Sequence, residues 1–267
     1  MNLAVHPESV FLIIYSGGYC GEFLAWWLGQ HSGCVRTGYY NIGKNRYIGN
    51  HYYNYTLTQT GTRDKLFLTG HCARSPSKNG ITVPDPAQHI NLYATQKYHR
   101  FFNYLYMIKS VFYTFRVDKP QSKFNDRPTE WNQFLESLNG REFFTGAEME
   151  SWLYSRHQTS IEQWTKTYWQ KSMSHTRFNP VSKINYDISN LFFNNNIGQG
   201  CADFCQVLNV INCPELETQM SEYHQENLRL VENYSGTTVD EFLELSDSTV
   251  ESIIVNNTQA ALAKAGK

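Results

Sequence analysis

The sequence predicts a three-layer α/β/α protein, in which helices cover both faces of a mainly parallel central sheet. Short apolar runs alternate with longer segments of helical period, and the run at 10–15 passes through a glycine turn into a helix at 22–29. Runs at 65–70, 89–95 and 181–186 have strand composition and are bounded by turn residues. This alternation is typical of a parallel sheet with crossover helices.

Longer helices are expected between residue 97 and about residue 263. Aromatic residues recur at helical spacing in segments 97–115, 145–157 and 160–174, Pro214 opens another expected helix, and a last helix covers about 247–263. Aromatic stripes of this kind belong to the core far more often than to a ligand site. We therefore expect these side chains to pack rather than to bind.

The domain organisation is expected to be simple. A chain of 267 residues suits one α/β domain, here residues 1–267, with insertions. Residues 36–64 are rich in Gly, Asn, Thr and Tyr and predict an irregular insertion, whereas about 118–175 predicts a helical one. Internal repeats are not evident.

Composition excludes several classes of protein. With 41% hydrophobic residues and a formal net charge of −1, the chain is neither disordered throughout nor built mainly to bind nucleic acid. The apolar run at 10–15 is too short for a signal peptide, and no segment reaches the roughly 18 apolar residues of a membrane span. We expect a cytoplasmic protein. The six cysteines form no C-x-x-C pair, so neither a metal site nor a redox motif is predicted.

The turn between the first strand and its helix is the clearest candidate site. It consists of Ser16, Gly17, Gly18, Tyr19, Cys20 and Gly21, followed by Glu22 and Phe23. Such a turn directs backbone amides and the positive end of a helix dipole to one spot, where phosphate or sulfate can bind. It is not the NTPase loop, because Glu22 and Phe23 stand where that loop needs Lys and Ser or Thr. The alternative is that the glycines only make a tight connection.

The order of the segments resembles the sulfotransferase family, P-loop-like α/β proteins that use 3′-phosphoadenosine-5′-phosphosulfate as donor. Residues 16–24 resemble the family's phosphosulfate loop, and 66–71 resembles the strand that ends at its catalytic base. Residues 90–100 resemble the segment that binds the 3′-phosphate, and 184–188 with 204–210 resemble a later strand and helix. The resemblance spans most of the chain.

The resemblance implies roles for particular residues. His71 would be the general base toward a hydroxyl of a small molecule or glycan, and the donor would be held by residues 16–23 with Lys97 and Arg100. No metal ion is implied. His71 could instead cap a strand end through a backbone hydrogen bond. Gly18 stands where the family has Lys or Arg, and Glu22 stands where it has Thr.

Two other functions stay open at this point. One is a non-catalytic interaction or virion-associated protein on the same fold, which would not bind the nucleotide. The other is a hydrolase with Cys20 as nucleophile, because Gly18-Tyr19-Cys20-Gly21 resembles a nucleophile elbow apart from Glu22, which replaces its last glycine. The sequence indicates neither the acceptor nor the oligomeric state.

Overall fold

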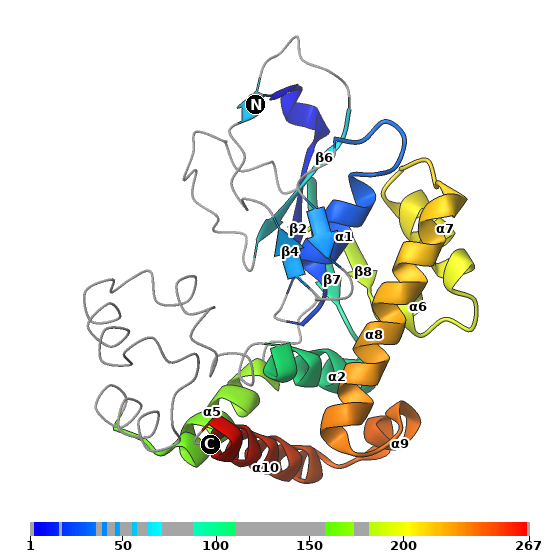
Figure 1. The fold of residues 1–267 in the computed structure, drawn as a ribbon. Helices are drawn as coiled ribbons and strands as arrows, with labels where there is room; N and C mark the ends of the chain where they lie inside the picture. Colours follow the sequence, from blue (N-terminus) through cyan, green and yellow to red (C-terminus); the bar gives the residue numbers. More distant parts are fainter. Residues whose placement is uncertain are drawn as a thin grey trace. The chain divides into compact units, whose positions relative to one another are not determined.

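A parallel sheet forms the centre of the fold. The computed structural model describes residues 3–15, 18–35, 39–41, 46–48, 55–57, 64–70, 88–109, 158–173 and 182–265. Within these ranges the central sheet has four strands, β2 (Val10–Ile14), β6 (Leu66–Gly70), β7 (His89–Tyr93) and β8 (Ile184–Asp187). Their spatial order is β6-β2-β7-β8 and every pairing is parallel (Figure 1). The predicted α/β fold with a parallel sheet is confirmed.

The first predicted strand is an inner strand, as expected. β2 lies between β6 and β7, and its Leu12, Ile13 and Ile14 are buried. β-Branched and large aliphatic residues suit a strand that is covered on both faces. Two polar residues, His89 and Asn91, are buried in the neighbouring strand β7, and Asn91 Nδ2 donates to Oδ1 of Asn185 on β8 at 3.0 Å. The pair satisfies a buried amide that would otherwise destabilise the sheet.

The strand order locates one special place on the sheet. From β2 the chain proceeds to β6 on one side, whereas from β7 it proceeds to β8 on the other side. The direction of winding therefore reverses between β2 and β7. In open α/β sheets, ligands bind outside the carboxyl ends of the strands at such a reversal.

Short strands lie outside the central sheet. β3 (Tyr39–Asn41) pairs with β4 (Arg46–Ile48) in antiparallel fashion, and β1 (Leu3–Val5) pairs with β5 (Tyr55–Leu57) in parallel. The segment predicted as an irregular insertion thus contains a short antiparallel pair. β8 pairs with β7 only from Ile184 onward, so it begins later than predicted.

By its internal contacts the chain divides into two compact units. Unit 1 comprises residues 1–102 and 175–229, and unit 2 comprises 103–174 and 230–267. The division falls within two helices, α2 (Gln96–Met107) and α8 (Glu217–Ser235). The single domain expected from the sequence stays a prediction.

Unit 1 holds the sheet and the helices that adjoin it. They include α1 (Gly21–Leu28), α6 (Ser189–Phe192), α7 (Ile197–Val207) and the short 3-10 helix η5 (Pro214–Leu216). α1 contacts β2 and β6 and is buried on nearly all sides, which explains its apolar composition (Figure 1). Asn196 caps the start of α7, and its side chain accepts hydrogen bonds from the amides of Gly198 and Gln199.

Unit 2 is helical in its described part. It contains α5 (Ile161–Met173), α9 (Val239–Glu244) and α10 (Asp247–Ala265). Tyr104 packs against Phe242 with ring centroids 4.7 Å apart, and its hydroxyl accepts a hydrogen bond from Asn257 at 3.0 Å. α9 begins with a capping box formed by Thr238 and Glu241. Threonine followed three residues later by glutamate is a sequence signal for the start of a helix, and the sequence analysis did not predict α9.

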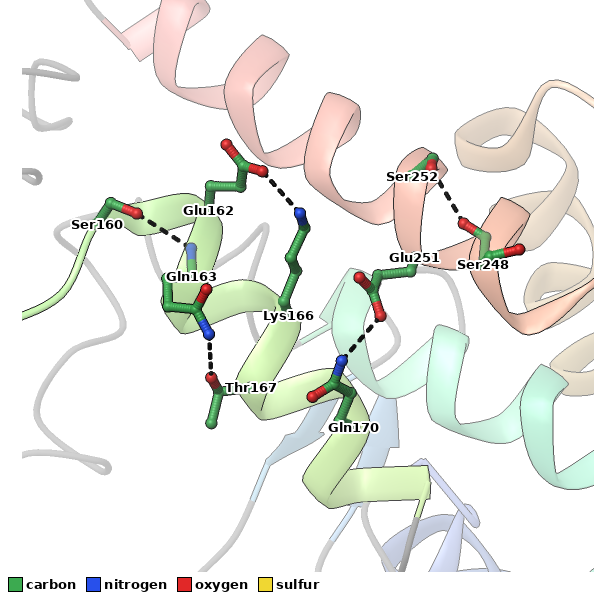
Figure 2. A network of polar contacts seen from close by, with 9 residues as sticks. All are labelled: Ser160, Glu162, Gln163, Lys166, Thr167, Gln170, Ser248, Glu251 and Ser252. Atoms are coloured by element: carbon green, nitrogen blue, oxygen red, sulfur yellow. Dashed lines mark hydrogen bonds and ion pairs between the residues drawn. The ribbon is translucent and has the colours of Figure 1, made fainter.

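Polar side chains join α5 to α10 (Figure 2). Gln170 on α5 donates to Glu251 on α10 at 3.2 Å, and Lys166 pairs with Glu162 one turn away at 2.7 Å. Exposed pairs of this kind contribute at most about 1 kcal/mol each. The burial of Trp169 contributes more to the stability of α5 than such an exposed pair does.

The predicted helices at 160–174 and 247–263 are confirmed as α5 and α10. α2 covers the first part of the helix predicted at 97–115, and residues 110–115 lie outside the described residues. The predicted helix at 145–157 and most of the insertion at 118–175 lie outside the described residues. Among the helices that the structure describes, none is both long and apolar enough to cross a membrane.

Candidate functional site

The glycine turn follows the carboxyl end of β2, beside the reversal point of the sheet. Ser16 and Gly17 lie outside the described residues. Gly18 has φ 88°, and Cys20, at φ 60° and ψ 18°, adopts the left-handed conformation directly before α1. A non-glycine residue in this conformation costs about 1 kcal/mol or more. Left-handed residues in a turn direct neighbouring amides toward one side and create a concavity suited to anions.

Gly21 is required where the turn becomes helix. A Cβ atom added to Gly21 would overlap the ring of Tyr15, which is itself buried at the end of β2. Only glycine lets α1 begin this close to the strand. The sequence pattern predicted a tight connection here, and the contact with Tyr15 is its physical reason.

The thiol of Cys20 is engaged in local contacts. Its Sγ donates to the Gly18 carbonyl at 3.2 Å and accepts from Asn227 Nδ2 on α8 at 3.9 Å. Close by, the rings of Phe23 and Tyr223 stack with centroids 3.6 Å apart and an angle of 6°. α8 thus holds both the turn and the first turn of α1. Neither the Gly18 carbonyl nor the Asn227 amide is a base, and the Cys20 hydrolase stays a prediction.

Tyr19 connects the turn to α2. Its hydroxyl forms a hydrogen bond with His99 Nδ1, and its ring meets Phe102 edge to face. Tyr19 is 1% exposed and His99 0%. Burial raises the pKa of Tyr19, and the nearby carboxylate of Asp187 raises it further, so the phenol stays protonated at neutral pH. The sequence interpretation assigned no partner to Tyr19 and overlooked His99.

The structure brings the predicted basic residues to the same edge of the sheet as the turn. Lys97 is exposed and Arg100 is half-buried, both in the first turns of α2, which follows β7. At about 100° per residue, Lys97 lies about 200° around the helix from His99 and Arg100 about 100°. Because the Tyr19–His99 bond marks the side of α2 that meets the turn, helical spacing favours Arg100 over Lys97 as the nearer of the two to the turn. Glu22 is half-buried in the first turn of α1, where the helix dipole favours a carboxylate.

The predicted catalytic base, His71, lies outside the described residues. The strand before it is described: β6 ends at Gly70, which is paired with Ile14 at the end of β2. The two strands thus end level with each other, at the edge that carries the turn.

His224 is a buried imidazole that sequence reasoning missed. It lies on α8 next to Tyr223 and is 9% exposed, with its ring 5.4 Å from that of Phe192 and 5.5 Å from that of Phe193. Burial lowers the pKa of His224 to about 4, so the ring is neutral at pH 7. Helical spacing alone gave no signal for this burial.

A second group of ionisable side chains surrounds His31. Its Nδ1 accepts from the amide of Cys213 at 3.0 Å, and its Nε2 lies 3.9 Å from Cys205 Sγ. Burial raises the pKa of Cys205 to about 12 and that of Cys34 to about 11. Protonated thiols are poor nucleophiles, which disfavours Cys205 and Cys34 as catalytic groups. Within the described part of the chain, no group of three or more His, Cys, Asp or Glu is arranged to hold a metal ion.

Comparison of the chain with known protein families, with curated proteins and with solved structures finds no match.

Proposed function

We propose that the turn at residues 18–22 binds a phosphate or sulfate group, and that the chain is a sulfotransferase-like protein with a three-layer, P-loop-like fold. The observation that carries the proposal is the position of the turn. Its left-handed residues lie at the carboxyl end of β2, next to the reversal between β2 and β7. Backbone geometry and sheet topology thus favour the same place for an anion.

The first turns of α2 support a ligand with two anionic groups. α2 starts beyond the carboxyl end of β7, the neighbour of β2, and carries Lys97 and Arg100. Tyr19 and His99 connect the two segments directly. A nucleotide with phosphates at two positions would meet the turn with one group and α2 with the other. The donor proposed from the sequence, 3′-phosphoadenosine-5′-phosphosulfate, has this character.

In the proposed reaction, an acceptor hydroxyl attacks the sulfur atom of the donor. A new sulfur–oxygen bond forms while the bond between sulfur and the phosphate oxygen breaks, and the nucleotide 3′,5′-bisphosphate leaves with that electron pair. His71 would take the proton of the attacking hydroxyl. The turn amides would stabilise the negative charge that develops on the leaving phosphate.

Calorimetry with adenosine 3′,5′-bisphosphate tests the binding step. We expect saturable binding that sulfate or pyrophosphate competes away. Gly18→Ala should weaken it by about tenfold or more, because alanine at φ 88° is strained and displaces the turn. Gly236→Ala is the matched control: Gly236 also has positive φ, 72°, but has open space around it and lies in unit 2. The affinity of Gly236→Ala for the bisphosphate should equal that of the wild type.

If the wild type binds no bisphosphate at millimolar concentration, that result would favour the alternative function, a non-catalytic interaction protein. Labelling of Cys20 by an acyl substrate analogue, without nucleotide binding, would favour the hydrolase.

His71→Ala tests the proposed base. With an acceptor that supports turnover, kcat should fall by about 100-fold, the usual contribution of a general base, while donor affinity stays unchanged. Gly18→Ala should show the reverse pattern, a weaker donor affinity with a smaller change in kcat. Full activity of His71→Ala would remove His71 from the mechanism, and equal losses of donor affinity in both variants would make it a donor contact.

A further inference from the structure

A buried hydrogen bond connects two parts of unit 1 that are 80 residues apart in the sequence. Tyr19 belongs to the turn after β2, and His99 belongs to the first turns of α2 after β7. Both side chains are almost completely inaccessible to water. The Tyr19 ring is held further by edge-to-face contacts with the rings of His99 and Phe102. A buried polar pair of this kind has few alternative arrangements that satisfy both partners.

We propose that Tyr19 and His99 are a positioning pair that fixes the distance between the anion-binding turn and the basic start of α2. The inference rests on the proposed function, because it concerns a ligand that contacts both segments. Neither the Tyr19 nor the His99 side chain touches the ligand; only the backbone amide of Tyr19 belongs to the anion-binding turn. Their hydrogen bond sets where Arg100 stands relative to the turn amides, and so lets one rigid nucleotide bisphosphate reach both.

The physical reason lies in the cost of misplacement. A ligand with two anionic groups gains from its second contact only if the protein holds both binding groups at the matching separation. When the Tyr19 hydroxyl is removed, the buried hydrogen bond to His99 Nδ1 is lost, and the start of α2 is free to shift. A single small anion contacts only the turn, so its affinity should not change when the start of α2 shifts.

The test compares two probes, inorganic sulfate and adenosine 3′,5′-bisphosphate, by calorimetry on the full chain. For Tyr19→Phe we expect sulfate affinity within about twofold of wild type and bisphosphate affinity about tenfold weaker. Arg100→Gln should weaken bisphosphate binding about tenfold in the wild type and less than about twofold in Tyr19→Phe. This lack of additivity is what distinguishes positioning from a general loss of stability.

Two sets of variants control for structural damage. Tyr104→Phe removes an equally buried tyrosine hydroxyl, bonded to Asn257 in unit 2, and should leave both affinities unchanged. His99→Asn keeps a polar atom near the position of Nδ1 and should restore most of the bisphosphate affinity that His99→Leu loses. A similar loss of bisphosphate affinity in Tyr19→Phe, Tyr104→Phe, His99→Asn and His99→Leu would contradict positioning.

The outcomes separate this inference from the proposed function. If the wild type binds neither probe, the proposed function is wrong and the inference falls with it. If the wild type binds both probes but Tyr19→Phe weakens them equally, or the Arg100→Gln effect stays additive, the function stands and the positioning role is wrong.

Discussion

Replacing Gly21 by alanine is expected to lower the free energy of unfolding by about 3 kcal/mol and to abolish anion binding. The added Cβ would overlap Cδ1, Cε1 and Cγ of the buried Tyr15 ring, which are ring atoms rather than the end of a flexible chain. Either the ring or the start of α1 must move, and both displace the turn. Urea unfolding and calorimetry with the nucleotide bisphosphate measure the two effects.

Gly198→Ala is the matched control for this substitution. Gly198 also lies in the first turn of a helix, but its added Cβ would meet the end of the Glu217 carboxylate, which can rotate away. Alanine is intrinsically better in a helix by about 1 kcal/mol, so this variant should be neutral or slightly stabilised. In a Tyr15→Ala background, Gly21→Ala should cost less than about 1 kcal/mol. An undiminished cost there would mean that Tyr15 is not the obstacle.

Acid is expected to destabilise the protein through His224. The pKa of this buried imidazole is about 4 in the folded state, against an ordinary value of 6.5. Below pH 6.5 the unfolded chain therefore binds a proton that the folded chain does not, and stability falls as the pH approaches 4. The loss over this window is about 3 kcal/mol. Above pH 6.5, His224 contributes no pH dependence.

Urea midpoints at pH 7.5 and pH 4 measure this effect. Since His224→Gln cannot take up the proton, it should lose about 3 kcal/mol less than the wild type between the two values. Burial also lowers the pKa of His31, which acts in the same direction and remains in the variant. The same pH dependence in wild type and His224→Gln would show that the imidazole is not buried as described.

The strands of the sheet were predictable because their information is local. Apolar, β-branched runs such as 10–15 specify a covered strand, and the glycines after it specify a tight turn into a helix. α7 was harder to predict, since Gly198 and Gly200 weaken the helical pattern and its cap, Asn196, lies in a run of asparagines.

The candidate site was predictable only in part. The turn after the first strand carries its own signal in Gly18 and Gly21. The bond between Tyr19 and His99 depends on which strands are neighbours, and no local pattern specifies that. The same holds for His224, whose burial follows from the rings packed around it. Contacts between segments that are far apart in the sequence cannot be predicted from the spacing of residues within one segment.

A crystal structure with adenosine 3′,5′-bisphosphate would test the central claim most directly. We predict that one phosphate lies against the turn, with its oxygens about 3 Å from backbone nitrogens of residues 18–22, and that the other lies beside the start of α2 near Arg100. A nucleotide bound at another edge of the sheet, with the turn amides beyond hydrogen-bond distance, would contradict the assignment of the turn as the anion site.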